Sequence, residues 1–192
     1  RIDLSLYPPA RLQEKISKEG LWRVLLDKDH LAADLPEPST AQFQIQPPSA
    51  KAFEDCCNEF WWVSPYVAKG LCRQEHLYAV WHMEAAIRKE LLKMLAWWVG
   101  ARQGYQVQLG KQYKYLQAHL DPSEWKLLMN TCRLDKPAYC WQALFAAQRL
   151  FRRASRQVGE HFGFACPPYD EKVTPYIEGL FRRWQEISLK PD

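Results

Sequence analysis

Four of the chain's 13 prolines fall within one short stretch, ADLPEPSTAQFQIQPPSA, at residues 33–50. Proline lacks a backbone N–H and fixes its own φ angle, so no regular helix can run through this stretch. The chain before the stretch is short, and the chain after it is long. The sequence therefore predicts two structured parts, residues 1–31 and 50–192, joined by a linker or extended arm at 32–49.

The first part predicts a strand, a helix and a second strand. In RIDLSLYP, aliphatic residues alternate with Asp3, a serine and a tyrosine, which is the period of a strand. ARLQEKISKEG predicts a short helix that ends at Gly20, and LWRVLLDKD predicts another strand. Two strands and one helix bury too little surface to be stable alone. We expect this part to pack on something else.

The second part predicts helices throughout. The segment DPSEW contains a clear helix start, with Asp121 as the cap, Pro122 at the first helical position and Glu124 in the first turn. The predicted fold class is α+β, a small strand–helix–strand piece followed by an α-helical bundle. The helices are expected at 51–71, 75–101, 111–120, 122–132, 138–161 and 171–188.

Composition excludes several classes of protein. Hydrophobic residues make up 47% of the chain, enough for a sizeable core, so the chain is not of the disordered class. No apolar run is long enough to span a membrane, and a net charge of +4 does not require nucleic acid as a partner. The six cysteines lack the spacing of a zinc site. Scattered cysteines are typical of buried free thiols, which predicts a cytoplasmic location.

The helix expected at 51–71 has two unlike faces. Its core face carries Phe53, Cys56, Cys57, Phe60, Val63 and Val67. Its other face carries Asp55, Glu59, Trp62, Tyr66 and Lys69. Either this helix is buried on both sides, or the second face lines a ligand site. In the latter case the carboxylates would meet cationic groups, the aromatic rings a ring system, and the lysine a phosphate.

The helix expected at 75–101 carries an acid within its apolar stripe. That stripe runs from Leu77 through Val80 or Trp81 to position 84, which is Glu84, and continues on the apolar residues beyond. A carboxylate in a core stripe is costly unless it is paired, and Arg88 follows one turn later. Two interpretations remain: an internal ion pair, or two groups that flank a cavity and contact a ligand.

Two lysines lie in the segment GKQYKYL, Lys111 and Lys114. Lysines interleaved with tyrosines can grip phosphates, although such a pattern usually belongs to a solvated face. The sequence contains no glycine-rich phosphate loop, and its five histidines have no metal-ligand spacing.

Several segments together resemble one family. LLDKD, FEDCCNEFWWVSPYVAKGL, IRKELLKMLAWWVG, GYQVQLGKQYKYL and PYDEKVTPY resemble the C-terminal two-thirds of the aminoglycoside 6-adenylyltransferases, which modify streptomycin. The resemblance covers nearly the whole chain, in order.

The resemblance implies that residues 1–31 are the C-terminal part of a nucleotidyltransferase-fold domain. Such domains carry a Gly-Ser signature, an Asp-x-Asp pair and a third acid within an apolar-acid-apolar strand. IDL matches the third position, so Asp3 is expected to be a catalytic and metal-binding residue. The signature and the pair are not in this sequence, and we therefore expect an incomplete, inactive fragment. The intact protein would transfer AMP from ATP, with Mg²⁺, to a hydroxyl of streptomycin.

The same resemblance places the antibiotic on the helical domain. Glu59 is expected to be the general base. The expected antibiotic ligands are Asp55, Trp62, Tyr66 and Glu84, since carboxylates form short pairs with guanidinium groups. Lys69 is the first choice for the triphosphate, followed by Arg88, Lys111 and Lys114. The expected partners are streptomycin and ATP, without nucleic acid or membrane, and the expected state is a monomer or weak homodimer.

A rival hypothesis is a non-catalytic helical module that binds RNA or a protein partner. Its best support is the basic clusters RRASR at 152–156 and FRRW at 181–184. We interpret both clusters as solvated helix faces. A nucleic-acid binder should have a continuous basic face, whereas an aminoglycoside site should be acidic.

Overall fold

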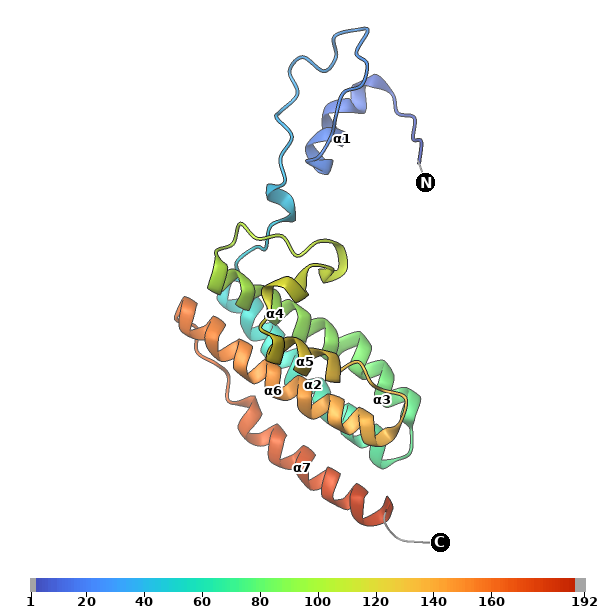
Figure 1. Ribbon diagram of the computed structural model, residues 1–192, viewed down its shortest axis with the longest axis vertical. Helices are drawn as coiled ribbons and strands as arrows, with labels where there is room; N and C mark the ends of the chain where they lie inside the picture. Colours follow the sequence, from blue (N-terminus) through green and yellow to red (C-terminus); the bar gives the residue numbers. More distant parts are fainter. Residues whose placement is uncertain (1–2, 189–192) are drawn as a thin grey trace. The chain divides into compact units, whose positions relative to one another are not determined.

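The structure is a computed structural model that describes residues 3–188 (Figure 1). The chain forms two compact units, Arg1–Gln44 and Ile45–Asp192. The division falls within the proline-rich stretch, between Gln44 and Ile45.

The first unit contains little regular structure. Its helical segments are η1 (Pro9–Arg11), α1 (Leu12–Glu19) and η2 (Ala41–Phe43). Helix α1 ends as predicted at Gly20, whose φ of 63° suits glycine. Residues 3–188 contain no strand, so the two predicted strands are not formed and the α+β class is not confirmed. A strand needs a partner with which to pair its backbone, and these two segments do not pair with each other.

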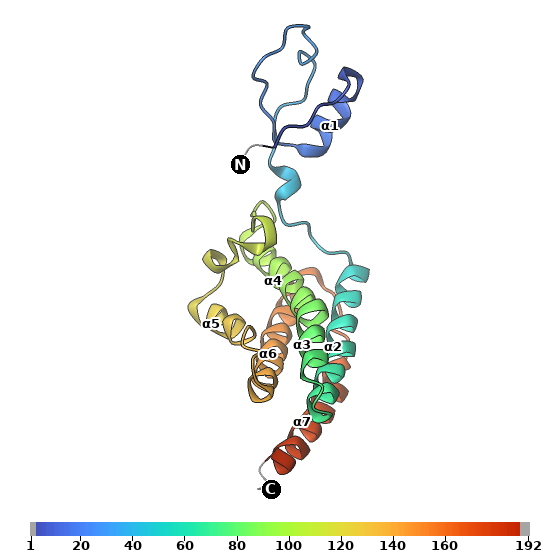
Figure 2. The same cartoon turned by 90° about the vertical axis from the view of Figure 1, so that its right-hand side faces the viewer.

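The second unit is a helical bundle (Figures 1 and 2). Its long helices are α2 (Ala50–Cys72), α4 (Arg88–Gln103), α6 (Pro137–Phe162) and α7 (Tyr169–Ser188). The shorter segments are α3 (His76–His82), the π-helical turn η3 (Met83–Ile87), η4 (Lys111–Tyr113), η5 (Leu116–His119) and α5 (Pro122–Asn130). Helix α2 packs on α3 and α7, and α6 packs on α4 and α5. Most of the predicted helices are confirmed.

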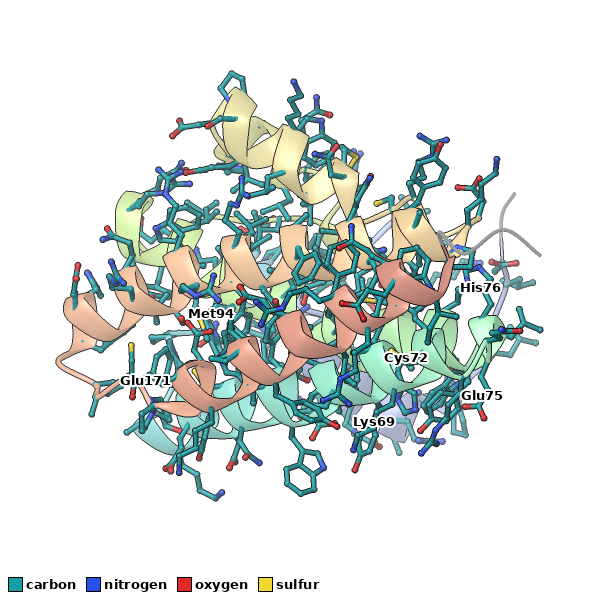
Figure 3. All side chains as sticks on the ribbon, turned by 90° about the horizontal axis from the view of Figure 1, so that it is seen from below. Lys69, Cys72, Glu75, His76, Met94 and Glu171 are labelled. Carbon is teal, nitrogen blue, oxygen red and sulfur yellow. The ribbon has the colours of Figure 1, made fainter. Side chains whose placement is uncertain are left out.

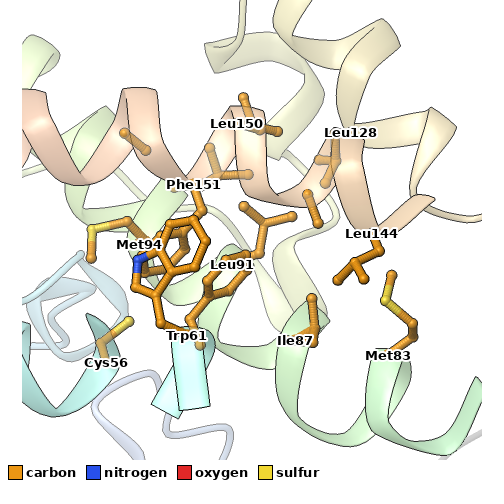
Figure 4. Close-up of a cluster of buried hydrophobic side chains, with 14 of the residues drawn as sticks. Cys56, Trp61, Met83, Ile87, Leu91, Met94, Leu128, Leu144, Leu150 and Phe151 are labelled. Carbon is orange, nitrogen blue, oxygen red and sulfur yellow. The ribbon is translucent and has the colours of Figure 1, made fainter. Parts of the chain in front are cut away.

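The core lies where α2, α4 and α6 meet (Figure 4). The predicted core face of α2 is buried throughout. Phe60 of α2 stacks on Phe151 of α6 with ring centroids 3.8 Å apart, and Trp61 meets both rings edge-on. Such aromatic packing removes large apolar surfaces from water and holds α2 in one rotational setting. The opposite face of α2 is thereby directed away from the core.

The apolar stripe predicted for residues 75–101 is wrong in its first half. Leu77 is 82% exposed and Trp81 63% exposed, while Ala79, Met83 and Ile87 are buried. The cause is η3, a π-helical turn between α3 and α4. On an α-helix, positions four apart drift by about 40° per step, and the wider π turn absorbs that drift. Core residues can therefore recur every four positions, and Glu84 lies outside the core.

The helix predicted at 111–120 is also wrong. This segment forms two short 3-10 turns, η4 and η5, instead. Gly110, Gln112 and Tyr113 have φ values of 68°, 55° and 59°, all in the left-handed region that interrupts a right-handed helix. The loop carries Lys111 and Lys114 on its exposed surface.

A partly buried ion pair joins α6 to α7. Arg152 binds Asp170 through Nε and through Nη2, the latter at 2.7 Å, and Nη2 also donates to Thr174 Oγ1 at 3.1 Å. Partial burial of Asp170 raises its pKa, but the hydrogen bonds from Arg152 and Thr174 outweigh that effect and leave the pKa below its usual value. The pair therefore stabilises the fold only while Asp170 is ionised.

We expect Asp170→Asn to lower the free energy of unfolding at pH 7 by about 1–2 kcal/mol, because a charged hydrogen bond between two helices is lost. Because the pKa of Asp170 is lowered in the folded state, the carboxylate binds a proton more readily in the unfolded state than in the folded state. This stabilisation is full above the ordinary carboxyl range and fades as pH falls through the lowered pKa. Urea unfolding at pH 7 and at acidic pH should therefore show the gap between the two proteins closing. Asp135→Asn, an exposed control, should change little; equal losses in both variants would contradict this assignment.

All six cysteines are free thiols. Burial raises the pKa of Cys57 and of Cys140 to about 12, so both thiols stay protonated and unreactive. Within residues 3–188, no helix combines the length and the apolar character needed to cross a membrane. The predicted compartment stays a prediction.

Candidate functional site

One side of α2 forms a stripe of charged and aromatic side chains that is exposed over its first three members and partly buried over its last two. Ser49 begins the helix by accepting a hydrogen bond from the Ala52 N–H at 3.1 Å. Trp62 is 64% exposed, so the hypothesis that α2 is buried on both sides is wrong at that residue, whereas Tyr66 is partly buried against the core as that hypothesis expected. The stripe, which we call the α2 face, consists of Asp55, Glu59, Trp62, Tyr66 and Lys69, the residues expected from the sequence.

The three predicted carboxylates of the helical unit differ in their partners. Asp55 accepts hydrogen bonds from Lys51 Nζ at 2.8 and 2.9 Å. Glu84 pairs with Arg88. Within the described part of the chain, Glu59 has no hydrogen-bond or salt-bridge partner. It is therefore the carboxylate most available to take a proton or bind a cation.

Aromatic side chains of α3 extend the α2 face. The imidazole of His82 stacks on Tyr66 with centroids 5.4 Å apart, and it meets Tyr78 and Trp81 edge-on at 4.4 and 4.9 Å. Tyr78 lies directly against Gly70 of α2, where a Cβ atom would come within 2.9 Å of its ring. Gly70 thus lets α3 approach closely. Burial lowers the pKa of His82, which favours its neutral form.

The sequence did not identify these α3 residues as part of the site. Tyr78, Trp81 and His82 recur at the spacing of one helix face, which is a usable signal. Their face could not be recognised, however, because the π turn alters the register of the apolar stripe.

Lys69, which is labelled in Figure 3, is the last residue of the stripe. Its Nζ lies 5.8 Å from the ring centroid of Tyr66 and 5.9 Å from that of Tyr176 on α7. Both distances suit a cation–π contact. Lys69 is partly buried as a whole residue. Its ammonium group has no carboxylate partner among the described residues, so it can still bind an anion.

Arg88 has a structural role. Its guanidinium donates to both oxygens of Glu84 at 2.9 Å, to Thr131 Oγ1 at 2.7 Å and to the Thr131 carbonyl at 2.6 Å. Thr131 is buried and follows α5, so Arg88 ties the end of α5 to the start of α4. The predicted Glu84–Arg88 ion pair is therefore formed. Glu84 also lines a hollow of about 770 Å³ together with Met129 and Arg133, so the alternative interpretation, that the pair flanks a cavity and contacts a ligand, stays a prediction.

The remaining predicted residues lie apart from the α2 face in the sequence. Lys114 Nζ rests over the Tyr115 ring at 4.7 Å, and Lys111 is exposed. Asp3 is exposed in the first unit. Residues 3–188 bring no three His, Cys, Asp or Glu side chains together, so these residues alone do not fit a magnesium site.

The two basic clusters differ from each other. Arg182 and Arg183 are exposed on α7, as expected of a solvated face. In RRASR, however, Arg152 pairs with Asp170 and Arg153 with the buried Glu124, so the prediction of a merely solvated face is wrong there. That prediction failed because both acidic partners are distant in sequence.

These observations define a helical domain with an exposed face of carboxylate, aromatic and lysine side chains. The family model described as streptomycin adenylyltransferase matches residues 1–180. The chain belongs to this family.

Individual relatives agree with the family model. The chain is 40% identical over 182 residues to the aminoglycoside 6-adenylyltransferase of Bacillus subtilis (strain 168), covering 94% of this chain and 64% of that protein. It is 38% identical over 192 residues to that of Campylobacter jejuni, covering 100% of this chain and 66% of that protein. A crystal structure of a Bacillus subtilis aminoglycoside 6-adenyltransferase has a TM-score of 0.67 and 38% identity, covering 90% of this chain and 63% of that one. The chain thus spans about two thirds of the length of these relatives.

Proposed function

We propose that this chain is the antibiotic-binding part of an adenylyltransferase that transfers AMP from ATP to a hydroxyl of streptomycin. The family membership and the names of the relatives support adenylyl transfer to an aminoglycoside. The observation that carries the assignment of the site is Glu59, an exposed carboxylate left unpaired by the described residues and placed one turn from Trp62.

Glu59 would act as the general base. A nucleophilic hydroxyl must lose its proton as it attacks phosphorus, and a carboxylate within hydrogen-bond reach can accept that proton. Asp55 already has Lys51 as a partner, and Glu84 already has Arg88. Glu59 therefore needs no rearrangement of an ion pair before it acts.

The α2 face suits a cationic sugar. A guanidinium group can lie over Trp62 or Tyr66 as a cation–π contact, and can also bind a carboxylate. The exposed Lys51–Asp55 pair is worth little in water, so an incoming guanidinium can replace Lys51 at Asp55. Glu84 would contribute less, because Arg88 already holds both of its oxygens.

For the nucleotide phosphates we propose Lys69, Lys111 and Lys114, all of which are without a carboxylate partner among the described residues. Arg88 is left out because its donors are already used. Asp3 would be one Mg²⁺ ligand of the complete enzyme. The ion, when bound, would offset the charge of the triphosphate, and it would need further ligands besides Asp3.

We propose that the first unit belongs to a nucleotidyltransferase-fold domain. Leu4 and Leu6 are 85% and 87% exposed, and Leu25 and Leu26 are 87% and 74% exposed. These leucines lie in the two segments predicted as strands, and such exposed apolar residues are typical of surface that another part of a protein covers. Pairing with neighbouring strands would bury them.

The proposed antibiotic site is tested by calorimetric titration of this chain with streptomycin. We expect Trp62→Ala and Asp55→Asn each to weaken binding about 5- to 100-fold, through the loss of a stacking surface and of a charged hydrogen bond. Trp62→Phe should restore most of the affinity, and Asp135→Asn should leave it unchanged. If none of the α2-face variants alters binding, the face is only a helix surface and the proposal fails.

A further inference from the structure

A hollow lies against α4 and α6 and shares no residue with the α2 face. Its volume is about 430 Å³. The lining consists of Trp98, Gln157 and five arginines, which are Arg102, Arg149, Arg152, Arg153 and Arg156. We propose that this arginine pocket binds a compact phosphate anion of two or more negative charges. The proposal does not depend on the function proposed above.

Part of the arginine pocket is built into the fold. The guanidinium carbons of Arg102 and Arg153 lie 4.3 and 5.3 Å from the Trp98 ring centroid. Both arginines also contact Glu124, at 3.1 and 3.4 Å, and the Glu124 side chain is fully buried. Glu124 Oε2 in turn accepts the Asp121 N–H at 3.0 Å and so caps α5. These contacts give the pocket a rigid wall.

The pocket nevertheless has more positive than negative charge. In the described part of the chain, its five arginines have only three carboxylates within 4.0 Å: Glu124, Asp170 and Asp121, the last 4.0 Å from Arg102. A fourth carboxylate, Glu178, acts on Arg152 from farther away. Five arginines against four carboxylates still leave the cluster positive. Arg149 and Arg156 are both exposed and, within residues 3–188, have no carboxylate in contact, so they are the arginines that can bind an anion.

The spacing of these arginines gathers their side chains on one side of α6. Arg149, Arg152, Arg153 and Arg156 follow one another at steps of three, one and three positions, so all four lie on the same face of the helix. Like charges three and four positions apart on a helix repel each other, and the carboxylates paired with Arg152 and Arg153 offset much of that repulsion. A bound anion would offset the charge that Arg149 and Arg156 retain.

Phosphate is the anion that fits this chemistry. Guanidinium groups bind phosphate oxygens with two parallel hydrogen bonds, and they are less strongly hydrated than lysine. Arg149 and Arg156 lie roughly 10 Å apart along the helix axis. A compact anion that lies between them can therefore reach both guanidinium groups. The charge converges on one hollow, whereas a nucleic-acid backbone is usually followed by a longer basic stripe. We therefore favour a small ligand over RNA.

The test is calorimetric titration of the full 192-residue chain with inorganic pyrophosphate at low salt. We expect saturable binding that the double variant Arg149→Gln, Arg156→Gln weakens at least about 10-fold, because two charged hydrogen-bonding groups are lost. The matched control is Arg182→Gln, Arg183→Gln, which removes the same charge from α7 and should change the affinity less than about 2-fold. Since all four arginines are exposed, both variants should keep the melting temperature of the parent protein.

Parallel titrations identify the source of the phosphate. Tighter binding of ATP than of pyrophosphate, lost in the Arg149/Arg156 variant, would support the pocket and assign it to a nucleotide. Absence of saturable pyrophosphate and ATP binding, or equal losses in both double variants, would overturn the proposal. Binding of a single-stranded RNA alone, abolished by the Arg149/Arg156 variant, would also overturn it and favour a nucleic-acid surface.

Discussion

Glu59→Gln in the complete enzyme is expected to lower kcat about 10²–10⁴-fold while streptomycin still binds. The amide keeps the size of the side chain but cannot accept the hydroxyl proton, and loss of a general base costs rates of this order. The rate that remains should lose the acidic limb of its pH profile, because the titrating group is gone. Pyrophosphate release at saturating ATP and streptomycin measures kcat, and calorimetry measures binding.

The matched control for this prediction is Glu54→Gln. Glu54 is an exposed carboxylate of α2 that lies outside the α2 face, so its loss should leave kcat and KM unchanged. An unchanged kcat for Glu59→Gln, combined with weaker antibiotic binding, would make Glu59 a substrate anchor. The base would then have to be sought elsewhere, first at Glu84.

Arg88→Met is expected to lower the free energy of unfolding by about 2–4 kcal/mol. Methionine can fill most of the volume, but the buried Thr131 loses both of its hydrogen bonds from Arg88, and Glu84 loses its partner. The end of α5 should then separate from α4. Urea unfolding followed by circular dichroism measures the loss.

Two further variants separate this structural role from nucleotide binding. Lys89→Met removes a neighbouring exposed charge and should cost little. Glu84→Gln should cost less than Arg88→Met, because the Glu84 side chain is 49% exposed and Arg88 keeps Thr131. An Arg88→Met protein with unchanged stability and a raised KM for ATP would instead support the nucleotide role predicted from the sequence.

The sequence was sufficient for features that depend on local pattern. Helical periodicity predicted α2, α5, α6 and α7. On α2 the same periodicity assigned Phe60 to the core face, and Glu59 and Trp62 to the opposite face. These predictions were correct because a helix on the surface of a folded domain buries one face. The pattern of apolar residues along the helix shows which face that is.

Other features depend on partners that are distant in sequence. The pairs Arg152–Asp170 and Arg153–Glu124 turn an apparently solvated cluster into the wall of a pocket. The two segments predicted as strands have no pairing neighbour within residues 3–188, and a strand is not stable without one. The segment 111–120 has left-handed backbone at Gln112 and Tyr113. Neither residue type favours that conformation, so the sequence contains no sign that the helix is interrupted.

The π-helical turn has a consequence for how this domain tolerates change. Each residue added to or removed from an α-helix rotates everything beyond it by about 100°. A π-helical turn is an exception, because its backbone hydrogen bonds span one residue more than those of an α-helix. Deleting one residue from Met83–Ile87 would close the wide turn to an ordinary α-helical turn, so Tyr78, Trp81 and His82 would keep the side they share with Tyr66. The same deletion elsewhere in α3 or α4 would rotate one part of the helix against the other. The turn is thus the place where this helix pair tolerates a change of length by one residue.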